Sequence, residues 1–148
     1  MELQLNFKAE VSGIAPIVER VTALAQKMHC DPGREMEIAL ALQEALANAV
    51  VHGCESDPSK TVECRVICSE SPSQNHSGSN QMLIVIRDPG AGFDPERVPN
   101  PKVGENVNAY HGRGLHLIHE LMDEVSFGAG GREIRMRASL SALRGSDV

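Results

Sequence analysis

The stretch from Ile38 to Val51 most constrains how this chain can fold, because it is the richest apolar run in the sequence and yet contains charged and amide side chains. Glu44, Asn48 and His52 are spaced four residues apart, so they lie along one face of a predicted helix. Apolar residues fill its other side, which predicts a largely buried helix. A carboxylate and an amide on such a helix face a polar cavity or are hydrogen-bonded, and an exposed polar stripe is the alternative.

The remaining elements follow from hydrophobic periodicity, which is two in strands and three to four in helices. We expect strands at 3–7, 60–69, 82–86, 125–127 and 133–140, and helices at 14–28 (capped by Ser12), 32–51 (capped by Asp31 and ending near Gly53) and 112–123. We expect a flexible hairpin loop at 70–80, an irregular lid at 94–111 and a frayed tail at 142–148. Short turns between adjacent strands favour a mixed, mainly antiparallel sheet. Three helices covering one face of it make an α+β fold, a two-layer α/β sandwich.

Length and composition indicate one domain spanning 1–148 and exclude several functions. The 14 Lys and Arg residues against 20 Asp and Glu give a net charge of -6, which argues against a nucleic-acid partner. No run of about 18 apolar residues and no signal peptide occur, so we expect no membrane association. The 4 cysteines without an export signal predict reduced thiols and a cytoplasmic location.

A second candidate motif begins at Asp88, directly after the predicted buried strand 82–86, in the run DPGAGFDP. A carboxylate at a strand end can accept a hydrogen bond from the amino group of a ligand. Gly90 and Gly92 carry no side chains, so the backbone there can approach a flat ring or phosphates closely. Without further context, the same pattern describes an ordinary turn.

A third candidate motif, HGRGL, opens the helix predicted at 112–123. The first turn of a helix presents unpaired N–H groups and a partial positive charge, which suit phosphate oxygens. Gly112 and Gly114 would admit a phosphate, and Arg113 could add a charge-assisted contact. A glycine-containing helix start is the ordinary alternative.

The order and spacing of the three motifs together resemble the nucleotide-binding domain of the GHKL (histidine kinase/Hsp90-like) ATPase superfamily. Within it, the chain is similar to the small anti-sigma factor serine/threonine kinases. The resemblance covers nearly the whole chain and is sharpest in LQEALANAVVHG (42–53), IRDPGAGFDPERVPNP (86–101) and GRGLHLIHELMDEVSF (112–127). It implies the Bergerat/GHKL ATPase fold, with ATP and Mg²⁺ as cofactors.

The resemblance also implies roles for residues of the first two motifs. Asn48 matches the asparagine whose amide oxygen holds Mg²⁺, and Glu44 matches the carboxylate that acts as general base. Asp88 matches the residue that accepts a hydrogen bond from the adenine amino group, and Gly90 and Gly92 match positions that shape the adenine pocket.

The third motif and the partners follow in the same way. Gly112, Arg113, Gly114 and Leu115 match the phosphate-binding end of the ATP lid. The family implies phosphorylation of an anti-anti-sigma (STAS-domain) protein, binding of a sigma factor in a partner switch, and a homodimer. The alternative function is a nucleotide-gated binding module that does not transfer phosphate.

Overall fold

Alternating strands and amphipathic helices build the architecture of the computed structural model, which describes residues 1–70, 80–90 and 110–141. In chain order the elements are β1 (Glu2–Lys8), a 3-10 turn (Val11–Gly13), α1 (Ile14–Lys27), α2 (Pro32–Ala47), a π-helical turn (Asn48–Gly53), β2 (Thr61–Ser69), β3 (Gln81–Arg87), α3 (Tyr110–Leu121), β4 (Glu124–Gly128) and β5 (Glu133–Ser139). The predictions for 94–109 and 142–148, and most of 70–80, lie outside the described residues.

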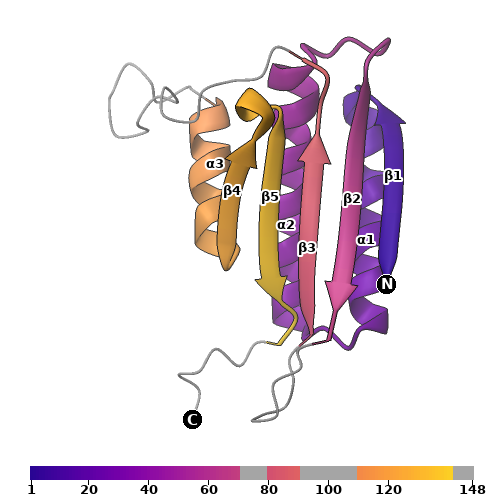
Figure 1. The fold of residues 1–148 in the computed structure, drawn as a ribbon, viewed down its shortest axis with the longest axis vertical. Coiled ribbons are helices and arrows are strands. Elements are labelled where there is room, and N and C mark those ends of the chain that lie inside the picture. The colour runs from indigo at the N-terminus through magenta and orange to yellow at the C-terminus, as the bar shows by residue number, and fades with distance from the viewer. Residues whose placement is uncertain (71–79, 91–109, 142–148) are drawn as a thin grey trace.

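The five strands form one sheet in the order β1-β2-β3-β5-β4, and every neighbouring pair is antiparallel. All three helices lie on one face of this sheet, with α2 between α1 and α3 (Figure 1). The predicted α+β fold of two layers is therefore confirmed. The sheet is wholly antiparallel because its strands are joined by hairpins or by connections that return across one face.

The core lies between the sheet and the helices, and the strand alternation decides which residues enter it. In β2, Val62 and Cys64 are fully buried, whereas Glu63 and Arg65 point to the open face. The sheet register places Cys64 opposite Leu5 of β1 on one side and opposite Ile86 of β3 on the other, so apolar rows run across the strands. These rows meet the apolar faces of the helices.

Arg34, in the first turn of α2, is a buried cation that contacts Ser139 at the opposite end of the sheet from Asp88, and its side chain is 1% exposed. Its guanidinium donates to the carbonyl oxygens of Ser139 (2.9 Å) and Leu121 (2.5 Å). It also pairs with Glu37 at 3.0 Å and lies 3.1 Å from Asp123 Oδ1, an ion pair without hydrogen-bond alignment. Arg34 therefore fastens α2 to the ends of α3 and β5.

Several helix limits differ from their predicted positions. Ser12 lies in the 3-10 turn, and Gly13 takes the N-cap position of α1, where a Cβ atom would lie 2.6 Å from the Phe7 ring. The regular part of α2 ends at Ala47 rather than Val51, since β-branched valines and a glycine favour the helix less. The π-helical turn continues to Gly53, the predicted end. The helix α3 begins and ends two residues before its predicted limits.

Candidate functional site

A pocket with about 290 Å³ of empty space, including space open to solvent, lies between α2, α3 and the adjoining ends of β3 and β5, and is here called the inner cavity. Its walls are mainly apolar and carry a few polar groups, as is usual for ligand sites. Asn48, Asp88 and Leu115 come from the three separate sequence motifs and line this one cavity. The complete lining consists of Ala45, Asn48, Ala49, Ile86, Asp88, Leu115, Gly131, Arg132 and Ile134.

Asn48 contributes a buried amide to the inner cavity, and the residue is 6% exposed. Among the residues that the structure describes, neither its amide oxygen nor its amide nitrogen has a hydrogen-bond partner. Leaving a buried polar group unpaired costs about 1–3 kcal/mol, so such groups in folded proteins usually have a ligand, an ion or a water. The amide oxygen is the hard, neutral donor that Mg²⁺ accepts, so this residue fits the metal that the sequence suggests.

Asn48 is also the first residue of the π-helical turn, which follows α2 without a break. The Cys54 N–H donates to the Ala49 carbonyl oxygen at 2.9 Å, five residues earlier. Single π turns inside α-helices are frequent at functional sites, because they change the direction in which side chains point.

Glu44 lies one turn before Asn48 on α2 and is half-buried. A Cβ atom at Gly114 of α3 would lie 3.2 Å from Glu44 Oε2 and 3.4 Å from Asn48 Nδ2. The two side chains therefore converge on a point of α3 where the absence of a side chain at Gly114 leaves space between them.

Glu44 does not line the inner cavity. It lines a separate groove of about 940 Å³ between α1 and α2, here called the α1–α2 groove, together with Val11, Ile14, Ala15, Val18, Glu19, Gln43 and Ala47. The carboxylate thus stands between Gly114 on one side and this largely apolar groove on the other.

Asp88 directly follows β3 and is 7% exposed. Burial raises the pKa of its carboxyl group, while the Gly90 N–H and the charges of Arg132 and Lys60 oppose that rise. The Gly90 N–H donates to Asp88 Oδ1 at 2.9 Å. The carboxylate is therefore held in one orientation at the wall of the cavity, where it can accept a hydrogen bond.

Gly53 is a site residue that the sequence indicated only as the end of a helix. A Cβ atom there would lie 2.5 Å from the Asp88 carboxyl group, and one at Gly90 would lie 1.6 Å from the Gly53 carbonyl oxygen. Gly90 therefore packs against the backbone of Gly53, whereas we expected it to admit a ligand ring. Gly53 ends the first motif, and this position was the only feature of the sequence that pointed to it. Its contact with Asp88 could not be predicted, because it depends on how the end of α2 packs against the sheet.

The third motif lies inside α3. Gly112 and Arg113 belong to its first turn, since the helix begins at Tyr110, and Leu115 is buried against the inner cavity. Gly92 lies outside the described residues.

Arg132 also lines the inner cavity, but none of the three sequence motifs includes it.

Comparison with known proteins shows the family of the chain. The family model of the histidine kinase-like ATPase domain matches residues 7–138. The chain belongs to the histidine kinase-like ATPase family. It is 31% identical over 134 residues to the anti-sigma F factor of Bacillus cytotoxicus, covering 84% of this chain and 80% of that protein. It is 29% identical over 129 residues to the anti-sigma F factor of Geobacillus stearothermophilus, with the same coverage.

These matches confirm the resemblance to the anti-sigma factor kinases of the GHKL superfamily. An ATPase domain of this family implies ATP binding, and two of the predicted site residues, Asn48 and Asp88, line the inner cavity. No helix within the described residues is long and apolar enough to cross a membrane.

Proposed function

We propose that this chain is a Mg²⁺-ATP-dependent protein kinase that phosphorylates a serine or threonine of a STAS-type anti-anti-sigma protein and also sequesters a sigma factor. The observation that carries the proposal is the amide of Asn48, which has no hydrogen-bond partner in the described part of the chain and lies beside Glu44 where both approach Gly114. The anti-sigma F factors to which the chain is similar support the choice of partners.

The nucleotide would lie in the inner cavity. Asp88 would accept a hydrogen bond from the adenine amino group, and the Gly90 N–H would keep the Asp88 carboxylate in place. The phosphates would extend toward the beginning of α3, where Gly112 and Arg113 lie in the first turn, close to the positive end of the helix dipole, and Gly114 and Leu115 follow in the second turn.

Asn48 would hold Mg²⁺ through its amide oxygen. When bound, the ion neutralises phosphate oxygens and orients them for transfer. Glu44 would accept the proton of the acceptor hydroxyl, whose oxygen then bonds to the γ-phosphorus while the bond to the β-bridging oxygen breaks and ADP leaves. A carboxylate in this role must lie beside the γ-phosphate, and the closeness of Glu44 to Gly114 supports that position.

The α1–α2 groove supports an approach path for the acceptor segment. Glu44 lies in its lining, and Val11 at its edge is 63% exposed. A partner segment in this groove would bring its hydroxyl to Glu44 from the side opposite the inner cavity.

The test incubates the full chain with labelled ATP and candidate STAS proteins. We expect label on a serine or threonine of one of them, and we expect Glu44→Gln to abolish the transfer while ATP binding persists. ATP-dependent partner binding without any phosphoserine or phosphothreonine would instead support a nucleotide-gated binding module. Co-purification with a sigma factor tests the second half of the proposal, and the homodimer stays a prediction that light scattering can check.

A further inference from the structure

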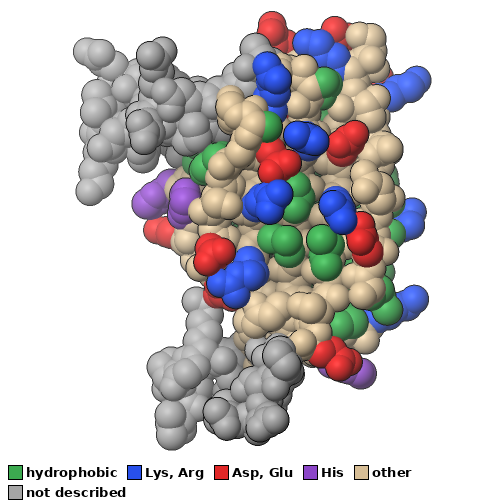
Figure 2. Space-filling view, in the orientation of Figure 1, with side chains coloured by type: hydrophobic (Ala, Val, Ile, Leu, Met, Phe, Trp, Pro, Cys, Tyr) green, Lys and Arg blue, Asp and Glu red, His purple; other side chains and the backbone are tan. Residues whose placement is uncertain are grey.

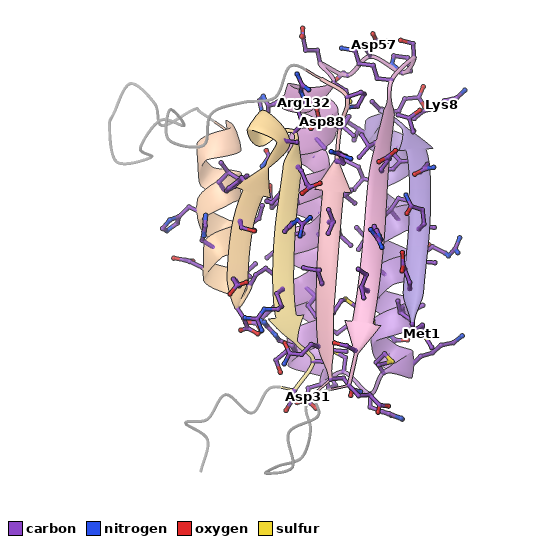
Figure 3. The ribbon with its side chains drawn as sticks, in the orientation of Figure 1. Met1, Lys8, Asp31, Asp57, Asp88 and Arg132 are labelled. Atoms are coloured by element: carbon purple, nitrogen blue, oxygen red, sulfur yellow. The ribbon has the colours of Figure 1, made fainter. Side chains whose placement is uncertain are left out.

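Among the described residues that line the inner cavity, Arg132 is the one with a positive charge, and it lies beside Asp88 (Figure 3). The Asp88 N–H donates to the Arg132 carbonyl oxygen at 2.9 Å, which fixes the two residues next to each other at the ends of β3 and β5. The charge of Arg132 also acts on the Asp88 carboxylate and favours its ionised form.

The turn between β4 and β5 holds Arg132 in this place. Ala129, Gly130 and Gly131 follow one another with φ values of 51°, 68° and 88°, a left-handed run that only glycine adopts freely. Gly131 is buried and lines the cavity together with Arg132. A backbone strained in this way at one end of a strand is typical of functional sites.

Arg132 also borders a second space, an outer cleft of about 580 Å³ on the other side of Asp88. The outer cleft is lined by Thr61, Glu63, Arg87, Asp88, Pro89, Ala129 and Arg132. Asp88 and Arg132 line both spaces, so they form the wall between them.

Arg132 differs from the arginines on the open face of the sheet. That face carries alternating blue and red side chains, so its cations lie next to acids (Figure 2). Arg132 is an exposed residue, and its guanidinium makes no hydrogen bond or ion pair within the part of the chain that the structure describes. The paired arginines are Arg65 with Glu2 (2.7 Å), Arg87 with Glu133 (3.7 Å), Arg135 with Glu133 (2.9 Å) and Arg137 with Glu124 (3.1 Å).

We infer that Arg132 is a second base-recognition residue. It donates a hydrogen bond to the adenine ring nitrogen that lies next to the amino group, while Asp88 accepts a hydrogen bond from that amino group. Adenine presents an amino donor and, beside it, a ring nitrogen acceptor. A carboxylate acceptor next to a guanidinium donor is the complementary pair. Guanine presents a carbonyl oxygen in place of the amino group, and this oxygen would face the Asp88 carboxylate. The inference rests on the proposed nucleotide site and adds a residue that decides its specificity.

The test is isothermal titration calorimetry of the full chain with adenosine, ADP and ATP. We expect Arg132→Ala to weaken the affinity for all three by about tenfold, because a hydrogen bond from a charged donor to the base is lost in each case. We expect Arg135→Ala, a matched control on the open face, to change none of them. Adenosine that lacks the ring nitrogen acceptor, 1-deazaadenosine, should bind wild type and Arg132→Ala equally.

Two outcomes would overturn the role of Arg132 and leave the nucleotide site standing. One is an unchanged affinity of Arg132→Ala for adenosine. The other is a loss that grows from adenosine to ATP, which would assign the guanidinium to the phosphates. If wild type binds none of the three ligands, the proposed function fails together with this inference.

Discussion

At the scale of residues, the site depends on polar side chains that the fold buries without a complete set of partners. Asn48 is 6% exposed and Asp88 is 7% exposed, and both face the inner cavity. Removing a carboxylate or an amide from water weakens the free protein unless a ligand compensates. Replacing Asn48 or Asp88 should therefore change the stability of the free protein and its ligand affinity in different ways.

Replacing Asp88 with Asn should stabilise the free protein at neutral pH and weaken ATP binding. Burial raises the pKa of Asp88 in the folded state, so the folded protein loses stability as pH rises through that pKa. The neutral amide avoids this loss. Thermal unfolding should therefore show a higher Tm for Asp88→Asn at pH 7, and the difference should vanish below the unfolded pKa of about 3.9. The affinity for ATP should fall about tenfold or more, because the charged acceptor is lost.

Asp57→Asn provides the control with the opposite sign. Hydrogen bonds from Ser59 lower the pKa of Asp57, so its ionised form stabilises the fold above the unfolded pKa. Its replacement should lower the Tm at pH 7 and leave ATP binding unchanged. An Asp88→Asn protein that is less stable than wild type at pH 7 would contradict our account of the buried carboxylate.

At the scale of elements, the sequence was a good guide to which segments form helices and strands, and to the polar residues of the site. Asn48 and Asp88 stood out because they interrupt or end apolar runs. Gly53 and Arg132 did not, because their roles arise where α2, β3 and β5 meet, and no local pattern records that β5 lies beside β3. The π-helical turn was not predicted for a related reason. The hydrophobic period of 3.6 residues is measured over several turns and is hardly changed by a single wider turn.

The contact between α2 and α3 predicts that Gly114→Ala removes nucleotide binding without unfolding the protein. The added Cβ atom would lie 3.2 Å from Glu44 Oε2, in the space between the two helices. Alanine favours the helix by up to about 1 kcal/mol, which offsets the tight contact, so the free energy of unfolding should change by less than this amount. Calorimetry should show at least a tenfold loss of ATP affinity.

Gly33→Ala is the matched control in α2, because its Cβ atom would have nothing within 4 Å. It should raise the free energy of unfolding by about 0.5 kcal/mol and leave the ATP affinity unchanged. Full ATP binding by Gly114→Ala would show that nucleotide does not use the space between Glu44, Asn48 and α3.

The fastening of α3 to α2 through Arg34 gives a prediction about stability alone. Arg34→Met keeps the apolar stem but removes the donors to Leu121, Ser139 and the acidic partners. Breaking a buried ion pair lowers the free energy of unfolding by about 3 kcal/mol at the lower end of the usual range. We expect the lower end because the acidic partners of Arg34 are partly exposed. Urea unfolding should show this loss. Arg135→Met, whose side chain is 55% exposed, should cost less than about 1 kcal/mol, and equal losses for both variants would contradict the role of Arg34.

At the scale of the whole molecule, the sheet presents two unlike faces. The helices cover one face, and the open face carries interspersed charges around a small group of half-buried apolar side chains, Ile67, Leu83 and Val85 (Figure 2). The inner cavity opens at one end of the covered face, where α2 and α3 meet β3 and β5. The proposed function therefore depends on one ligand, ATP with Mg²⁺, that contacts α2, α3, β3 and β5 together.

The most direct measurement is the free energy of unfolding of the full chain with and without ATP, each in the presence and absence of Mg²⁺. Wild type should gain about 2.7 kcal/mol when Mg²⁺-ATP is present at 100 times its Kd. Asn48→Ala should lose the part of this gain that depends on Mg²⁺. A wild-type protein whose stability does not respond to Mg²⁺-ATP, or an Asn48→Ala protein that responds to Mg²⁺ as wild type does, would contradict the central claim that this cavity holds the nucleotide and its metal.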